Sequence, residues 1–258
     1  MKIKILEAKK EKFVFLLEES TPPFANALRR IMISEVPTLA VEWADFHENS
    51  SALYDEIIAH RLAMIPINFE PSKFNYTEDC KCNNEGCPLC QAVFVIDKTG
   101  PCVVHSGDMK PSNRNAKPTD PNFVIVELLK GQRLRMEAVA RMGIGKSHAK
   151  WQAANASYQY YPEIKVHSAD FKTYLKDVPK SAIDIQSKSI TVKDFTKTDM
   201  IKKAAEESDG AFEVIEDATR FIFTIESISG LSPDYIATTA GRILAEKAED
   251  FKKQVAKI

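Results

Sequence analysis

The sequence predicts an α+β protein in which a β-rich domain is inserted between two similar terminal segments. Each terminal segment combines short apolar runs, typical of half-buried strands, with a helix that carries one apolar stripe. The middle of the chain contains mainly strand candidates. At 258 residues the chain can form one large domain or two to three small ones, and 44% hydrophobic with 28% charged residues is ordinary for a soluble globular protein.

The N-terminal segment predicts a β-hairpin followed by a helix. Apolar runs at Ile3–Leu6 and Phe13–Leu17 flank a charged turn. A hydroxyl residue and two prolines at 20–23 are typical of a helix start, and Pro37 would end the helix. The expected apolar stripe comprises Phe24, Ala27, Leu28, Ile31 and Met32. Beside the stripe, Arg29 and Arg30 would normally form a solvated flank.

The C-terminal segment repeats this design. Residues Arg220–Ser227 alternate like a half-buried strand, and Ser232-Pro233 begins a helix of roughly 24 residues, about 36 Å long. Its apolar stripe comprises Ile236, Ala240, Ile243, Leu244, Ala248, Phe251 and Val255. Either the chain's own sheet or a partner helix could cover this stripe, and the residues alone do not decide between them.

The middle of the chain predicts a short helix and a series of strands. The helix covers Asp55–Leu62, and the clearest strand is Gln132–Met142, whose apolar and charged residues alternate strictly. Other strand candidates are Ala92–Ile96, Cys102–His105, Phe123–Leu129 and Tyr158–Val166, with a Pro/Asn/Asp-rich loop over Lys110–Asn122. Residues 167–213 form a third section, with a strand expected at Ser187–Val192 and a polar helix at Asp199–Glu207.

Four of the five cysteines fall within eleven positions, at Cys80, Cys82, Cys87 and Cys90. The two close pairs, with Gly86 and Pro88 forming a turn between them, suit four-thiolate binding of one zinc ion. Another thiophilic metal or an iron–sulfur cluster is the alternative, although the bacterial ferredoxin spacing is not matched. A disulfide pairing is disfavoured because residues 1–4 lack an apolar export segment, which predicts a cytoplasmic protein. Cys102 is expected to be a buried small hydrophobe.

Charge and motifs exclude several function classes. A net charge of −1 argues against a protein that grips duplex DNA by itself, and no apolar run reaches the length that spans a bilayer. The segment Gly143–Ser147 resembles a phosphate loop, but the glycine required at position 140 is alanine. We therefore expect a tight turn with Gly143 and Gly145 at positive φ. No catalytic constellation is visible: the five histidines are scattered, and nothing selects a pair of carboxylates.

Four blocks, in order along the whole chain, resemble the α-like subunits of RNA polymerase. In chain order they are Phe24–Ile31 with its continuation to Pro37, Asp55–Pro66, the cysteine loop 80–90, and Gly131-Gln132 with Gly143–Trp151. Within this family the chain is most similar to the larger of the two α-like subunits of the archaeal enzyme. Related forms are the third-largest eukaryotic subunit and the N-terminal region of bacterial α.

The resemblance implies a discontinuous dimerisation domain, residues 1–45 and 214–258, made of a sheet and two helices. Residues 46–166 would be the inserted β-rich domain, and 167–213 a ferredoxin-like remnant. Val178–Asp184 resembles the tail of an iron–sulfur motif, but the cysteines are missing, so no cluster is expected.

The implied function is that of a scaffold without catalytic residues in a nucleotidyltransferase, DNA-directed RNA polymerase. Expected partners are the small α-like subunit L in a heterodimer, the small subunits N and P, and the large catalytic subunits A and B. The chain would contact DNA and RNA only through the assembled complex. The expected partner interface comprises Phe24, Asn26, Leu28, Arg29, Arg30, Ile31, Ile236, Ile243, Leu244 and Phe251. Expressed alone, the chain should aggregate or self-associate through exposed Leu28, Ile31, Ile243 and Phe251.

Two other function classes remain possible from the residues alone. One is a stand-alone zinc-containing adaptor or RNA-binding module, against which the near-neutral charge counts. The other is a nucleotide-dependent enzyme that uses Gly143–Ser147, against which the alanine at position 140 counts.

Overall fold

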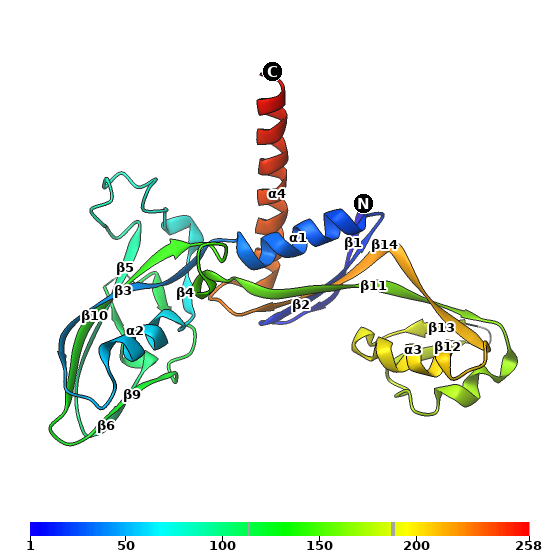
Figure 1. Ribbon diagram of the computed structural model, residues 1–258, viewed down its shortest axis with the longest axis horizontal. Helices are drawn as coiled ribbons and strands as arrows, with labels where there is room; N and C mark the ends of the chain where they lie inside the picture. The colour runs from blue at the N-terminus through cyan, green and yellow to red at the C-terminus, as the bar shows by residue number, and fades with distance from the viewer. Residues whose placement is uncertain (113, 187–188, 258) are drawn as a thin grey trace. The chain divides into compact units, whose positions relative to one another are not determined.

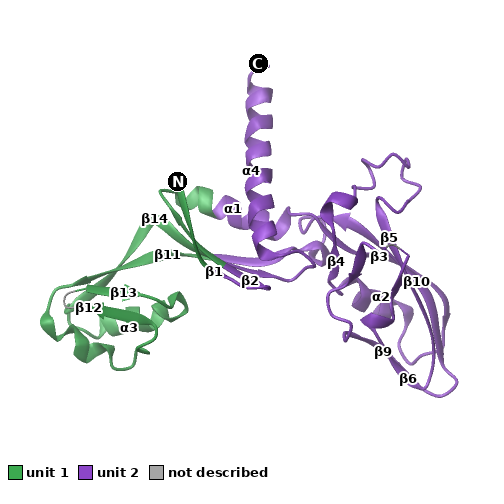
Figure 2. Cartoon of the chain, turned by 180° about the vertical axis from the view of Figure 1, so that it is seen from behind, with its two compact units in different colours: residues 1–6, 14–25, 158–223 green, residues 7–13, 26–157, 224–258 purple. Residues whose placement is uncertain are grey.

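The computed structural model describes residues 1–112, 114–186 and 189–257. They form two compact units, each made of several chain segments (Figure 2). Unit 1 comprises residues 1–6, 14–25 and 158–223, and unit 2 comprises residues 7–13, 26–157 and 224–258. Strands and helices are both abundant, so the expected mixed α and β composition is confirmed (Figure 1). Among the described residues, no helix is both long and apolar enough to cross a membrane.

One four-stranded sheet has the strand order β1-β2-β14-β11. Its strands are β1 (Lys2–Ala8), β2 (Lys12–Glu18), β11 (Ala154–Val166) and β14 (Phe212–Ser227). The expected N-terminal hairpin is confirmed, with the Lys9 N–H donating to the Lys12 carbonyl across its turn. In the part of β2 that belongs to unit 1 both faces are buried. Phe15 stacks on Phe223 at 5.0 Å between ring centres, and Val14 packs with Ile222 on the other face.

Two helices carry the apolar stripes expected at the two ends of the chain. Helix α1 spans Pro22–Ser34 and helix α4 spans Pro233–Val255, and both begin at the predicted prolines. Ser232 occupies the N-cap position of α4, although its side chain makes no capping hydrogen bond. The first half of α4 buries Ile236 and Ala240, and the second half projects away from the rest of unit 2 (Figure 1).

A second four-stranded sheet, in unit 2, has the order β3-β10-β5-β7. Its strands are β3 (Thr38–Asn49), β5 (Gln91–Thr99), β7 (Lys110–Pro111) and β10 (Arg133–Gly143). The alternation predicted for β10 is confirmed, because Leu134, Met136, Ala138 and Ala140 are all buried while Arg135 and Glu137 are exposed. Strand β3 had no counterpart in the sequence interpretation. Its pairing with β10 contains two register shifts, between Arg135 and Met136 and between Val139 and Ala140.

Short elements complete unit 2. Helix α2 (Asp55–Ala63) lies where the sequence predicted it, and the Arg61 side chain donates to the Ile125 carbonyl at 2.6 Å. Two further pairs of strands are antiparallel: β4 (Ile67–Phe69) with β8 (Ala116–Pro118), and β6 (Cys102–His105) with β9 (Val124–Leu128). The Pro/Asn/Asp-rich segment is therefore not only a loop, because β7 and β8 lie within it.

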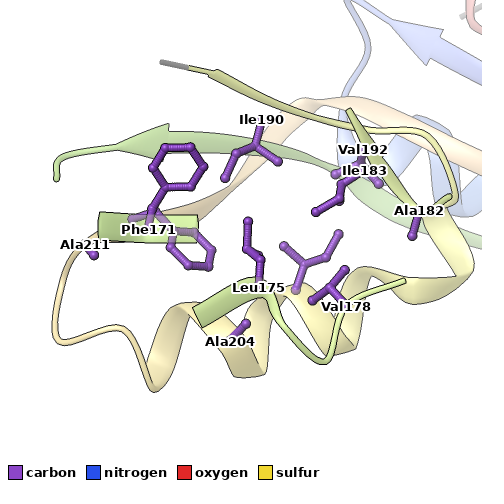
Figure 3. Close-up of a cluster of buried hydrophobic side chains, with 11 residues drawn as sticks. Phe171, Leu175, Val178, Ala182, Ile183, Ile190, Val192, Ala204 and Ala211 are labelled. Carbon is purple, nitrogen blue, oxygen red and sulfur yellow. The ribbon is translucent and has the colours of Figure 1, made fainter. Parts of the chain in front are cut away.

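Residues 167–213 form a small module with its own apolar core (Figure 3). A 3₁₀ helix (Ala169–Leu175), the antiparallel strands β12 (Ile183–Gln186) and β13 (Ser189–Val192), and α3 (Thr198–Glu206) surround this core. In Figure 3, Leu175 and Val178 point toward Ile183 of β12 and Ile190 of β13. Residues 187 and 188 of the predicted strand lie outside the described residues. An apolar core of aliphatic and aromatic side chains therefore holds this module together.

Candidate metal centre and partner-binding helix

The four clustered cysteines lie on one loop that precedes β5. Two tight turns shape it: the Asn83 N–H donates to the Cys80 carbonyl at 3.2 Å, and the Cys90 N–H donates to the Cys87 carbonyl at 3.0 Å. Between the turns Gly86 has φ +86°, a conformation that L side chains rarely adopt, as the predicted turn requires. The loop geometry therefore follows from the residues that the sequence analysis singled out.

The four thiols converge on one point. All four Sγ atoms lie within 4.8 Å of one another. The Cys80–Cys87, Cys82–Cys90 and Cys87–Cys90 sulfur separations are 3.5, 3.6 and 3.9 Å, and no disulfide joins them. A tetrahedral zinc site with Zn–S bonds of about 2.3 Å needs sulfurs about 3.8 Å apart. The residues present fit a four-thiolate metal ion in both number and spacing.

The protonation of these thiols differs from one to the next. Burial raises the pKa of the Cys90 thiol to about 12. Burial acts in the same direction on Cys82, but hydrogen bonds from the Cys80 thiol and the Gly86 N–H outweigh it and lower the pKa of Cys82 to about 7. Because thiolates are the ligands, a metal must displace protons from this set, and its affinity rises with pH.

Cys102 stands apart from the cluster. It lies on β6, is half-buried, and its Sγ contacts the Thr99 carbonyl at 3.6 Å. The expected full burial of this residue is therefore wrong, although nothing in its surroundings among the described residues makes it a fifth ligand.

Helix α1 contributes several residues of the expected interface, and the structure buries some of them. Leu28 and Ile31 are nearly inaccessible within this chain, so the expectation that they are exposed is wrong. Phe24 and Asn26 are half-buried, and Asn26 accepts a hydrogen bond from the Arg29 side chain at 2.9 Å. Of the interface residues expected on α1, Arg30 alone is exposed.

Helix α4 divides into a packed half and a free half. Ile236 is fully buried, and Ile243 and Leu244 are half-buried. From residue 245 to the last described residue every side chain is exposed, including Phe251 at 69% and Val255 at 50%. Leu244, Ala248, Phe251 and Val255 recur at spacings of four, three and four, so they line one side of the free half. This line of apolar residues is called the α4 seam below.

A groove of about 450 Å³ lies beside the packed half of α4. Tyr235 and Ile243 of the helix line one part of it, and Phe74 and Tyr76 from the segment before Cys80 line another. No sequence pattern pointed to this neighbourhood, because the two segments are far apart in the chain. The segment that leads into the cysteine loop therefore lies beside α4. A metal site whose effect is confined to its own loop would not need this contact.

The segment Gly143–Ser147 is not a phosphate loop. The N–H groups of Lys146 and Ser147 donate to the carbonyls of Ser34 and Ile144, so they are not free to hold a phosphate. The expected positive φ at Gly143 and Gly145 is wrong. Gly143 instead permits close approach: an added Cβ would lie 2.4 Å from the Trp151 indole. At Gly145 the added atom would lie 2.8 Å from the Ile33 carbonyl oxygen.

Comparison with known proteins decides the family. Residues 45–168 match the RNA polymerase Rpb3/RpoA insert domain. The DNA-directed RNA polymerase subunit Rpo3 of Archaeoglobus fulgidus is 36% identical over 99% of this chain and 98% of its own length. That of Thermococcus kodakarensis is 37% identical over 100% of this chain and 99% of its own length. The chain belongs to the Rpo3 family. The expected membership of an RNA polymerase subunit family is thereby confirmed, and the residue-level roles and domain boundaries stay predictions.

Proposed function

We propose that this chain is a non-catalytic assembly subunit of DNA-directed RNA polymerase. It pairs with the small α-like subunit L and offers the resulting heterodimer as a platform for the two large catalytic subunits, A and B, with N and P as further small partners. Family membership over the full length of the chain supports the polymerase. The α4 seam supports the pairing.

The α4 seam is the single observation that carries the pairing. About half of a long helix exposes an apolar line, and Phe251 and Val255 on that line are open to solvent. In water such a helix gains little stability from propensity alone, and most helical stability in proteins comes from packing an apolar face. A second helix laid along Leu244, Ala248, Phe251 and Val255 would supply that packing in the manner of a coiled coil.

Nucleotide transfer belongs, in this proposal, to the large subunits. Arg30 is exposed on α1, whereas Arg29 is tied to Asn26, so Arg30 is the better placed of the two for a contact with a large subunit. The four cysteines would hold one structural zinc ion. Zinc would fix the fold of their loop and take no part in the polymerase reaction.

The test is co-expression of this chain with the small α-like subunit of the same organism, followed by measurement of the mass of the complex in solution. Wild type should give a 1:1 heterodimer. Phe251→Ala should weaken it about tenfold or more, as truncation of a large apolar anchor does. Lys253→Ala is the matched control, since Lys253 lies on the opposite side of the same helix and is exposed. A monomeric wild-type chain, or equal effects of the two changes, would refute the pairing. A small RNA-bound species would favour the stand-alone binding module.

A further inference from the structure

A short apolar row crosses the outer face of the sheet β3-β10-β5-β7. Val139 of β10 lies opposite Trp43 of β3 on one side and opposite Val93 of β5 on the other. Residues opposite one another in antiparallel strands share a face, and the neighbours Ala138 and Ala140 are buried on the inner face. The three side chains therefore lie side by side on the outer face. Trp43 is 42% exposed, and Val95, further along β5, is exposed as well.

Arg141 extends this row and has an unmet hydrogen-bonding need. Its guanidinium carbon lies 3.8 Å from the centre of the Trp43 ring. Its Nε is buried and has no hydrogen-bond partner among the described residues, so a docking segment would meet the terminal nitrogens of this half-buried side chain. An arginine stacked on an aromatic ring keeps its planar fork of donors in a fixed direction, which suits a carboxylate.

Neighbouring contacts hold this stack in place, and the nearby Glu42 carboxylate is paired with another cation. The Trp151 indole N–H donates to the Arg141 carbonyl at 3.0 Å, which fixes the backbone at this position. The register shift in β3 leaves Glu42 without an opposite residue, and Glu42 pairs with Lys150, which itself lies over the Trp151 ring. Arg133 on the same face differs from Arg141, because its guanidinium is paired with the Asp97 carboxylate.

Acidic side chains lie on the other side of the row. Asp45 lies directly opposite Glu137, a like-charged pair that is unfavourable by itself. His47 approaches Glu137 only to 3.9 Å. The face thus presents Arg141 at one end, an apolar centre, and at the other end the carboxylates of Asp45 and Glu137 with Arg135 beside them.

We infer that Trp43, Val139, Val93 and Arg141 form a docking surface for a protein segment of another polymerase subunit. The segment presents a carboxylate to Arg141, an apolar side chain to the valine row, and a basic side chain to Asp45 and Glu137. Tryptophan and arginine are the residues that most often dominate binding energy at protein interfaces. A nucleic acid fits poorly, because Asp45 and Glu137 repel phosphates. This inference rests on the proposed function, since it names a second contact of the same assembly subunit.

The first test is competitive assembly in the native cell. Tagged variant and untagged wild-type chains are expressed together, and the variant's share of purified polymerase is measured. Trp43→Ala and Arg141→Gln should lower that share about tenfold. Arg135→Gln is the matched control, because it removes the same charge from an exposed position on the same strand. Arg141→Lys should also lower the share, since lysine lacks the planar fork.

Two further measurements separate docking from stability and from the proposed function. The heterodimer with the small subunit should form equally with all four variants, so a loss there would refute this inference without touching the α4 seam. If the drop in assembly merely follows a drop in thermal midpoint of the heterodimer, the Trp43–Arg141 stack is only structural and the inference is wrong.

The partner segment is identified by a photo-crosslinking residue placed at Val95 in the assembled polymerase. The expected product joins this chain to a subunit peptide with an aspartate or glutamate close to the crosslinked position. Replacing that acid by arginine should restore assembly of Arg141→Glu. A crosslink to nucleic acid, the absence of any crosslink, or a failed charge exchange would overturn the inference.

Discussion

Gly143 is the residue whose role changed most between sequence and structure. Beside Lys146 and Ser147 it suggested a phosphate loop or a turn, yet it is the last residue of β10 and has the Trp151 ring against its Cα. Only the absence of a Cβ was readable from the sequence. The reason for that absence, a ring brought in from a later segment, is a tertiary contact and has no local signal.

Gly143→Ala should destabilise the chain by about 1–3 kcal/mol, the usual cost of forcing extra atoms into a packed site. The added Cβ would push the Trp151 ring from its hydrogen bond to the Arg141 carbonyl. Gly241→Ala is the control: nothing lies within 4 Å of its added Cβ on α4, and alanine should stabilise an exposed helix by about 0.5–1 kcal/mol. Urea unfolding measures both. Equal effects in the same direction would contradict this account of Gly143.

For the four clustered cysteines, in contrast, residue type and spacing were sufficient to predict that their thiols meet. Four thiols in eleven positions predicted a common centre, and their sulfurs meet within 4.8 Å. The burial of Leu28 and Ile31 within the chain could not be predicted in the same way. An apolar helix stripe has the same pattern whether its own chain or a partner covers it.

At the scale of elements, strict alternation was a reliable guide and irregular segments were not. Strand β10 was located within one residue at each end because one face is buried along its length. Strand β3 was missed because its buried run stops after Val41 and the remainder is exposed or only half-buried. Strands β7 and β8 contain prolines and owe their pairing to distant partners, β5 and β4.

The proposed metal ion would fix the fold of the cysteine loop. Cys87→Ser should abolish stoichiometric zinc in the purified chain, whereas Cys102→Ser should leave it unchanged, since Cys102 stands apart from the cluster. Metal content is measured by elemental mass spectrometry. Amide hydrogen exchange should rise over residues 74–91, while the packed half of α4, with Ile236 and Ala240 buried, stays protected. Global unfolding of the variant would mean that the groove beside α4 makes the loop essential to the whole unit.

Phe195 connects the core of the module over residues 167–213 with the sheet of the same unit. This side chain packs both against the module's core and against the cluster of Val14, Leu16 and Ile222 on the sheet. Phe195→Ala should therefore destabilise unit 1 by about 1–3 kcal/mol, less than a fully buried phenylalanine because Phe195 is only partly buried. Tyr174→Ala, an exposed position in the same module, is the control. Thermal unfolding with an unchanged midpoint for Phe195→Ala would contradict the coupling.

At the scale of the whole molecule, the α4 seam is a large apolar feature that the chain leaves open on a regular helix. Ending the chain at Ala248 removes Phe251 and Val255 but keeps Lys247, whose ammonium pairs with Glu35. Because every removed side chain that the structure describes is exposed, the free energy of unfolding should change by less than about 1 kcal/mol. The full-length chain alone should self-associate as its concentration rises, whereas the truncated chain should stay monomeric and fail to bind the small α-like subunit. Sedimentation equilibrium across a concentration series distinguishes the two. A truncated chain that still pairs would place the partner on α1 or on the sheet, and would reduce the α4 seam to an incidental feature.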